Sequence, residues 1–548
     1  MNENPVEGAV FSGSQPKPAK RRPFILFVFP ILLIIAAVLF LLWMKQRPVP
    51  LQAMVPETAV GYAVMNGEWW IENSKSIREL PDVKRAMDDF ERETAVSMEK
   101  EVLPCVGDVA IVVTGVKAQE PEFAFCMQPR DLPRAVKTYQ KLMKKAESDK
   151  WEKVTYQGVE LVALPDNGRD RILAGFDRGW VLMGAGSAVK QLIDSGAGRK
   201  PSAAEGGRLR NALASAGGGT VVRAVFDNKA VADVPGMSRT LPGQMPGKMD
   251  AVVGFSVIEA SDGFRVEWKQ KVDGAKLLER GKRIYSAGSE SWTIADQLPD
   301  STVAWLAFRN FGVLFKEVLE SFKEASSDQE YARGIAEIER LLYKDYAWLG
   351  AALDNIKQMS IGVTLRDNKE FGAVLVADTG AEDIAKNLCE GLVAEIRRNP
   401  EPPVVQNGNR WTIPISQDPA PEFPVEPAME RQGRLVTLTT HSSWLDSSRG
   451  KPGVPLPSAA ADSPVVFTAD LVFTDTIINA MEKAGGVEKD VIQLLRDLKL
   501  SKAKAVAWTT LDGDDIWSTR FEISGWPWKE AADSAVKYIR DHPNEVSL

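Results

Sequence analysis

The sequence predicts an α+β protein in which one N-terminal transmembrane helix precedes two tandem homologous domains of antiparallel sheets with helices packed on one face. Three observations predict this class. Residues 23–43 contain no charged side chain. Short segments of alternating apolar and polar residues follow one another with turns between them, as in antiparallel strands. One series of such segments occurs twice along the chain, which indicates an internal repeat.

The apolar run from Pro23 to Trp43 is long enough to cross a bilayer. Hydrocarbon about 30 Å thick requires roughly 20 apolar residues at a helical rise of about 1.5 Å. A secretory signal has a shorter apolar region and a small-residue cleavage site, whereas residues 44–50 (MKQRPVP) contain no Ala-x-Ala pattern. We therefore expect an uncleaved anchor, with a cleaved signal peptide as the alternative.

Cations beside the run predict its orientation, because they tend to stay in the cytoplasm. More of them precede the run than follow it: Lys17, Lys20, Arg21 and Arg22 on one side, Lys45 and Arg47 on the other. We expect residues 1–22 to be a disordered cytoplasmic tail and residues 44–54 to be a linker. The rest of the chain would be exported, which in a Gram-negative bacterium means a periplasmic body held at the inner membrane by one helix.

The composition is that of a globular protein, since 44% of the residues are hydrophobic and 26% are charged. The chain after the anchor is long enough for two or more domains of ordinary size. Its net charge is −7 and its basic residues are spread along the chain, so the basic footprint of a nucleic-acid-binding protein is absent.

The internal repeat begins with residues 56–62 (PETAVGY), which recur as residues 299–305 (PDSTVAW). Each copy continues with a helical pattern and then with two adjacent strands. The paired strands are DVAIVVTG with EFAFCMQP in the first copy, and SIGVTLRD with FGAVLVAD in the second. A second helical pattern follows each pair, LPRAVKTYQKLMKKA and AEDIAKNLCEGLVAEI, with apolar residues spaced three and four apart.

The remaining segments match in the same order. They are WEKVTYQGVELVAL with NRWTIPIS, GWVLM with GRLVT, TVVRAVFD with PVVFTADL, and GFRVEWKQ with DIWSTRFE. The last strand of each copy leads into a helix, from Ala275 and from Lys529. The ordered series therefore predicts two homologous α+β domains, at residues 55–291 and 296–548.

Three cysteines occur, Cys105, Cys126 and Cys389, and three cannot all pair. Cys105 and Cys126 bracket a predicted hairpin, so a disulfide between them is an open alternative. We favour buried free thiols, because a large exported domain needs no disulfide framework and a thiol packs as a small apolar side chain.

Residues 184–189 (GAGSAV) follow a strand and begin a helix, as a dinucleotide fingerprint does. The third glycine position is occupied by Val189, and the surrounding strands read as antiparallel. The segment therefore favours a tight turn with Ser187 as the helix N-cap over a nucleotide site.

The other polar motifs also favour structural roles. His441 and His542 are the two histidines, and no metal or triad spacing surrounds them, so we expect surface imidazoles. Residues 512–515 (DGDD) lack the spacing of a calcium loop and predict a hairpin turn. We assign no catalytic, cofactor-binding or metal-binding residue. A Ser–Lys or carboxylate pair stays open, because neither requires histidine.

Two tryptophan-rich segments, Trp69-Trp70 and Trp526-Pro527-Trp528, lie at the ends of predicted elements. They could form an exposed patch for a partner or a membrane surface. Packing at the core or its rim is the interpretation we favour, because large aromatic side chains fill the space between sheets and helices.

The chain resembles uncharacterised bacterial envelope families with one N-terminal span and an exported body. The resemblance is carried by the anchor and by three short motifs, PET at 56–58, GDVA at 107–110 and YQGV at 156–159. In particular the chain is similar to the YfaA-like family of unknown function, which is associated with a bacterial alpha-2-macroglobulin-like system. The resemblance implies an envelope location and a partner of that kind, and it carries over no catalytic residue.

The sequence thus favours a membrane-anchored periplasmic interaction or scaffold protein without enzymatic activity. One alternative is an exported binding module for an apolar or lipid-like ligand held between sheet and helices. A second is a hydrolase that uses carboxylates or a Ser–Lys pair. The sequence leaves open the identity of the partner or ligand, the oligomeric state and the physiological role.

Overall fold

The computed structural model describes residues 49–542 except for short gaps. The gaps are 118–119, 149–151, 164–170, 207, 210–219, 228–229, 231–250, 273–274, 286–291, 326–328, 367–369, 399–402, 415–424, 450–455, 457 and 513–514. The predicted tail at 1–22, the predicted anchor at 23–43 and the first part of the predicted linker lie outside the described residues. Within the described ranges, no helix is both long and apolar enough to cross a membrane.

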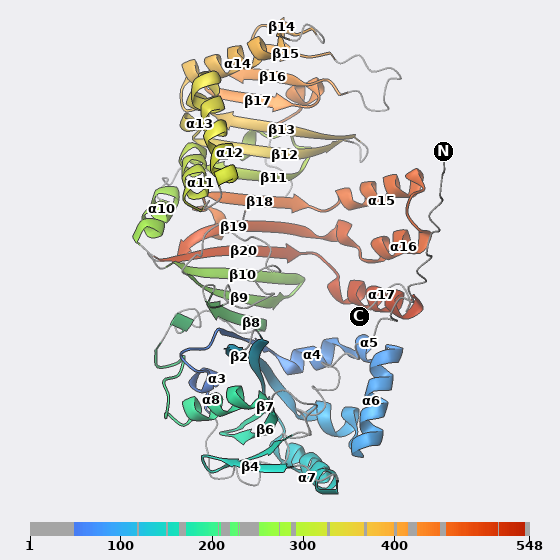
Figure 1. Ribbon diagram of the computed structural model, residues 1–548. Coiled ribbons are helices and arrows are strands. Elements are labelled where there is room, and N and C mark those ends of the chain that lie inside the picture. Colours follow the sequence, from blue (N-terminus) through green and yellow to red (C-terminus); the bar gives the residue numbers. More distant parts are fainter. Residues whose placement is uncertain are drawn as a thin grey trace, which may run out of the picture.

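The described strands form one antiparallel sheet of twenty strands (Figure 1). The strands of its first half run outward from the middle of the sheet to one edge. In spatial order they are β10 (Gly263–Val272), β9 (Ala251–Ala260), β8 (Thr220–Asp227), β1 (Gly61–Met65), β2 (Val106–Lys117), β3 (Glu120–Pro129), β7 (Trp180–Ala185), β6 (Ile172–Asp177), β5 (Val159–Ala163) and β4 (Glu152–Tyr156).

The strands of the second half run outward to the other edge in the same order. They are β20 (Ile516–Ser524), β19 (Lys504–Asp512), β18 (Val465–Asp470), β11 (Thr302–Arg309), β12 (Gln358–Arg366), β13 (Glu370–Asp378), β17 (Leu435–Thr439), β16 (Ala428–Gln432), β15 (Arg410–Thr412) and β14 (Val405–Asn407). Each strand therefore occupies the place of the strand numbered ten lower in the first half.

The two halves meet where β10 pairs with β20, and we call this pairing the seam. The two strands are antiparallel, with a register from Phe264 opposite Ile523 to Lys271 opposite Ile516. The sequence predicted a sheet in each domain, whereas the strands of both halves belong to one continuous sheet. The domain boundaries at 55–291 and 296–548 remain a prediction.

We call one side of the sheet the open face, onto which Val109, Val266 and Leu306 project, and the other side the closed face. At the outer strands of the first half, helices cover both sides. On the open face, α6 (Pro81–Thr94), η1 (Met98–Val102) and α7 (Leu132–Ser148) pack against a cluster that includes Val109 and Met127. On the closed face, α3 (Leu51–Met54) and α8 (Gly186–Gly196) pack against Ala124 and Cys126.

The prediction of helices on one face is therefore wrong for the first half. Successive residues of β3 alternate between the two clusters, so this strand is buried on both sides. The predicted linker at 44–54 is also partly folded, because Leu51 and Met54 of α3 are buried in the closed-face cluster. Apolar residues three apart place both side chains on the same side of this single helical turn.

In the second half one group of helices lies on the open face, at one end of the strands. Here α11 (Phe311–Ala325), α13 (Ala347–Asn355) and α14 (Glu382–Ile396) cover the apolar residues of the outer strands. The closed face is covered by Trp292, Trp444 and three short 3-10 turns instead. These turns are η5 (Ala295–Gln297), η7 (Ser442–Asp446) and η8 (Ser458–Ala460).

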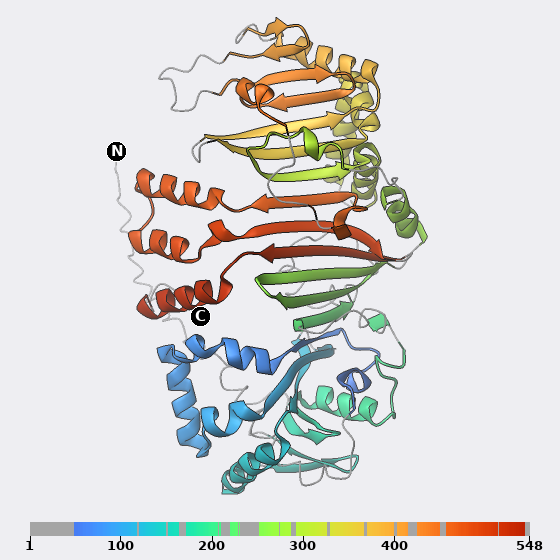
Figure 2. The ribbon, with the colours of Figure 1, turned by 180° about the vertical axis from the view of Figure 1, so that it is seen from behind.

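The remaining helices lie near the ends of the strands, and the view from behind shows the same placement (Figure 2). They are α4 (Gly67–Asn73), α5 (Lys75–Arg78), η2 (Leu103–Cys105), α10 (Ala275–Tyr285), α12 (Gln329–Arg340), η6 (Leu341–Asp345), α15 (Phe473–Ala484), α16 (Lys489–Asp497), η9 (Leu500–Lys502) and α17 (Trp528–Asp541). In both views the middle strands are free of these helices.

An ion pair joins the two halves beside the seam. Arg280 and Arg283 of α10 lie 3.1 Å and 2.6 Å from the carboxylate of Glu317 on α11. Arg280 is buried, and only 13% of the Glu317 side chain is exposed. The hydrogen bond from Arg283 lowers the pKa of Glu317 below its usual 4.5.

We predict that Glu317→Gln weakens the fold at neutral pH and flattens its acid sensitivity. A carboxylate whose pKa is lowered by folding stabilises the protein above its unfolded pKa, and this contribution disappears as the pH falls through the folded pKa. The substitution should lower the free energy of unfolding by about 1–2 kcal/mol at pH 7, and the loss should shrink towards pH 3.

Urea unfolding at several pH values measures this effect. The control is Glu337→Gln, which removes an exposed ion pair with Arg340 within α12 and should change little. An equal loss for Glu317→Gln at pH 7 and pH 3 would contradict the proposed role of the charge.

Candidate functional site

The two seam strands separate apolar from charged residues between the faces of the sheet. Alternate residues of a strand point to opposite sides. On the open face the strands carry Phe264, Val266, Trp268, Trp517, Phe521 and Ile523, whereas on the closed face they carry Arg265, Glu267, Lys269, Arg520 and Glu522. Ion pairs join the charged residues, for example Arg265 with Glu522 and Arg520 with Glu267. The alternation thus marks the open face as the one suited to burial.

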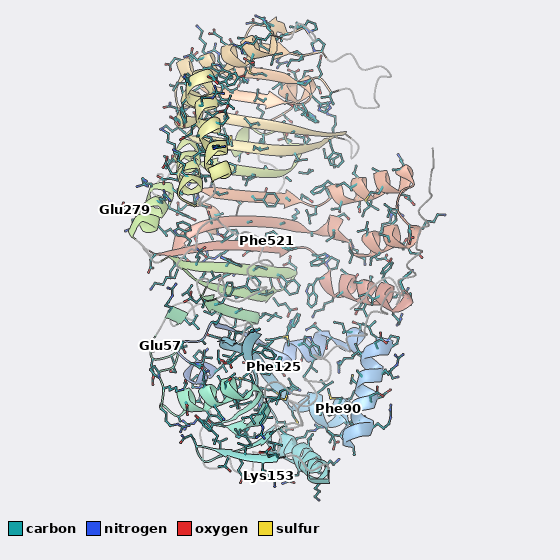
Figure 3. The ribbon with its side chains drawn as sticks, viewed as in Figure 1. Glu57, Phe90, Phe125, Lys153, Glu279 and Phe521 are labelled. Carbon is teal, nitrogen blue, oxygen red and sulfur yellow. The ribbon has the colours of Figure 1, made fainter. Side chains whose placement is uncertain are left out.

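One row of directly opposed apolar residues crosses the open face from the first half to the second. In the order of the strands from β3 to β13 the row is Met127, Val109, Met65, Val222, Val257, Val266, Phe521, Ala507, Phe467, Leu306, Ile361 and Leu375. Met127 and Val109 are buried beneath helices, whereas Val266, Phe521 and Phe467 are half-exposed. Phe521 lies in the middle of the sheet in Figure 3.

Several large side chains of this face are open to solvent. The exposed fractions are 42% for Ile111, 38% for Trp268, 40% for Ile361, 41% for Val363 and 37% for Phe371. Trp268 packs edge-on against Phe226 and Phe255, so its exposed surface belongs to a larger aromatic group. Contiguous apolar surface of this kind is unusual on a monomer and is typical of a binding site.

We call the strand surface of the open face between β2 and β12 its floor. This floor is nearly free of charged side chains. Between β2 and β12, the one ionisable side chain that the described residues place on this face is Glu259 at its rim. Its carboxylate accepts a hydrogen bond of 2.5 Å from the Trp69 indole and lies 3.6 Å from the Lys529 ammonium. With strands about 4.8 Å apart and same-face residues about 7 Å apart, the uncovered floor measures on the order of 600 Å².

Aromatic residues from both halves meet at one rim of the open face. Trp69 of α4 and Trp528 of α17 stack with ring centroids 5.6 Å apart, and Trp528 lies 4.7 Å from the ring of Phe264 on β10. Asn66 fixes the start of α4, because its side chain accepts the backbone N–H of Trp69 at 2.9 Å. Trp69 and Trp528 are half-buried. The two tryptophan segments of the sequence therefore contribute to rim packing, as favoured.

A groove with a volume of about 450 Å³ lies beside this aromatic cluster, between α4–α5 and α17. Both acidic and basic side chains line it: Glu72, Lys75, Glu79, Lys529, Asp533, Lys537 and Arg540. Because neither sign of charge dominates, the groove does not define a ligand.

The two histidines are structural, but the prediction of surface imidazoles is wrong for His441. That residue is 4% exposed, and its ring lies 4.2 Å from the ring of Trp444 in η7. His542 is half-buried, stacks on Tyr538 at 4.3 Å and approaches Asp490 at 3.2 Å. The polar residues beside His441 gave no signal that the following turn would cover it.

The glycine-rich segment at 184–189 is the junction of β7 and α8, in which Gly184 and Ala185 end the strand and the helix begins at Gly186. This junction follows an antiparallel pair, β6 with β7, and not a parallel βαβ unit. The N-cap is Ala185 rather than the predicted Ser187, whose hydroxyl donates to Glu122 at 2.7 Å. Ser187 lies inside the helix, which begins at Gly186, so it does not occupy the N-cap position.

The other motifs also take part in packing or ion pairs. Asp512 ends β19, and Asp515 lies 3.5 Å from Lys271 on the seam strand, while residues 513–514 are outside the described ranges. Cys105, Cys126 and Cys389 are buried and free. Burial raises the pKa of the first two thiols to about 12 and that of Cys389 to about 11. The described part of the chain contains no cluster of side chains suited to a metal ion.

Sequence reasoning did not single out the open face. The alternating segments GFRVEWKQ and DIWSTRFE predicted strands with one apolar side. They could not show that the apolar sides would adjoin or that the described helices would leave them uncovered, because both depend on which strands pair.

Comparisons with known proteins give a family but no activity. The family model described as "Protein of unknown function (DUF3352)" matches residues 75–400. No curated protein matches the chain significantly. Crystal forms IV and III of TP0453 match at 12% and 10% identity, over 43% and 44% of this chain and 85% and 88% of that one, with TM-scores of 0.27 and 0.26. Scores this low do not establish a shared fold.

We predict that replacing exposed residues of the open face reduces the binding of an apolar fluorescent dye. The variant is Ile361→Thr with Val363→Thr, which keeps β-branched side chains on β12 and therefore preserves its strand preference. Dye fluorescence should fall by about half, since this pair forms a large part of the exposed apolar patch, and the midpoint of thermal unfolding should change little.

The matched control is Val405→Thr. Val405 is 55% exposed but lies on the closed face of the edge strand β14. Equal effects of the two variants on the dye would show that the signal does not come from the open face.

Proposed function

Because the chain belongs to the DUF3352 family of proteins of unknown function, we propose a role from its own surface: it is a non-enzymatic interaction protein whose open face binds a partner protein. The observation that carries this proposal is the uncovered apolar floor. A sheet face with apolar residues in every row is normally packed against another layer. Here the outer strands have such a layer, and the middle strands expose Trp268 and Ile361.

A protein surface fits this floor better than a single lipid-like ligand. Small ligands occupy enclosed cavities that bury most of their surface, whereas this floor is broad and open. An area on the order of 600 Å² approaches the roughly 800 Å² per partner of ordinary protein interfaces. The apolar-ligand module is therefore the alternative that the experiment below must separate.

Enzymatic chemistry has less support. Catalysis by two carboxylates or by a Ser–Lys pair requires two ionisable or nucleophilic groups that converge on one pocket. On the floor, the described residues offer only Glu259 at the rim, where this carboxylate contacts Trp69 and Lys529. The open face therefore gives the hydrolase alternative no support.

The proposal includes a membrane tether at residues 23–43, with the tail in the cytoplasm and the body in the periplasm at the bacterial inner membrane. Its support is the length of the apolar run and the distribution of cations around it. The described residues begin at Val49, whose backbone N–H donates to the Arg178 carbonyl at 3.3 Å and whose carbonyl accepts from the Trp180 indole at 2.9 Å. Residues 44–48 span at most about 18 Å when extended, so this tether would hold the body close to the membrane.

The partner we propose is an envelope protein, with an alpha-2-macroglobulin-like protein as the first candidate. This candidate comes from the resemblance to the YfaA-like family. A tethered, exported body with an apolar face and no assigned active site is compatible with a display or scaffold role in such a system.

The test of partner binding is photocrosslinking from the open face in native membranes. A photoreactive phenylalanine analogue replaces Trp268 in the full-length chain, and a second chain carries it at Val405. We expect protein adducts from position 268 alone, because Val405 lies on the opposite face. Adducts made of phospholipid would favour the apolar-ligand alternative, and the absence of adducts at 268 would overturn the proposal.

The test of location is a reporter that is active only in the periplasm, fused after Leu548. The proposed orientation predicts an active fusion. The control is the same fusion without residues 1–43, which should remain in the cytoplasm and be inactive. A stable but inactive full-length fusion would contradict an exported body.

A further inference from the structure

The two halves of the open face are related by an approximate two-fold axis, and this symmetry indicates what kind of partner the open face binds. We infer that it consists of two equivalent half-sites, one from each half of the chain, and that the partner presents the same apolar element twice, as a two-fold symmetric protein does. This inference rests on the proposed function, since it specifies the partner that the open face binds.

The seam supplies the first step. Strands β10 and β20 hold the same place in their halves and pair in antiparallel fashion. Two corresponding strands that pair in this way are related by a two-fold axis perpendicular to the sheet. Because the further strands follow in the same order on both sides, this axis relates β8 to β18, β1 to β11 and β2 to β12. It also maps the open face onto itself.

Exposure supplies the second step. Ile111 on β2 lies opposite Ala63 of β1, and Ile361 on β12 lies opposite Leu306 of β11. Ala63 and Leu306 hold matching positions in the repeated strands VGYAVMN and VAWLAFRN. Ile111 and Ile361 are therefore corresponding residues, and their exposed fractions agree, at 42% and 40%.

The side chains of the floor determine what kind of element the partner must present twice. Both half-sites present uncharged apolar side chains: Val222, Val257 and Val266 in the first half, and Phe467, Ala507 and Phe521 in the second. The element must be apolar and uncharged, since an unpaired charge would lose its hydration on this floor. At a strand spacing of about 4.8 Å, Ile111 and Ile361 are separated by roughly 43 Å along the sheet, which leaves room for one copy of the element on each half-site.

The experiment compares crosslinks from the two half-sites in the full-length, membrane-bound chain. The photoreactive analogue is placed at Ile111 in one variant and at Ile361 in another, with Val405 as the control position and thermal unfolding as the check on folding. Mass spectrometry then identifies the partner peptide attached to each position.

We expect the same partner peptide from both positions and none from Val405. Different peptides at 111 and 361, or adducts from one position alone, would overturn the two-fold partner while leaving partner binding intact. An absence of protein adducts at 268 would overturn the proposed function itself. The two proposals therefore fail in distinguishable ways.

Discussion

The pairing of β10 with β20 is the contact on which the rest of the molecule depends. It turns two sets of strands that lie far apart in sequence into one sheet. It also brings the apolar sides of both strands onto the same face, where neither set alone would have a broad surface. The ion pair between α10 and α11 lies beside this seam, so a lateral contact between helices reinforces the hydrogen bonds between strands.

The two faces of the sheet are covered by different segments and to a different extent. On the closed face, α3 and α8 bury Ala124, and Trp444 of η7 packs in one cluster with Val374 and Val376 of β13. On the open face, helices cover the outer strands of each half, whereas near the seam α10 packs against Trp517 at one end of β20. The charged residues of the seam strands lie on the closed side, where Glu267 and Arg520 pair with each other. The apolar middle of the open face is thus the part of the sheet over which the described helices form no continuous second layer.

The sequence allowed the strands, most helices and the order of the repeat to be predicted, because alternation and helical spacing are local patterns. The joining of β10 to β20 could not be predicted, since it depends on two edges some 250 residues apart. Helix α3 was missed because it is a single turn, and the placement of α8 on the closed face depends on tertiary contacts that a local pattern does not contain. His441 was placed on the surface because burial by Trp444 depends on a turn with no distinctive pattern. The open face depends on both local alternation and distant strand pairing, and only the alternation could be predicted from the sequence.

The edge strands have a consequence for self-association. An exposed edge offers unpaired backbone groups that can recruit another chain, and a sheet with two long edges would grow into fibres. The seam uses one edge from each half, so only β4 and β14 remain at the borders of the described sheet. β14 is three residues long, and β4 carries Glu152 and Lys153 in exposed positions. The short length of β14 and the charges of β4 disfavour the addition of a strand from another chain. The protein therefore avoids edge-to-edge association, while its open face remains free to bind a partner.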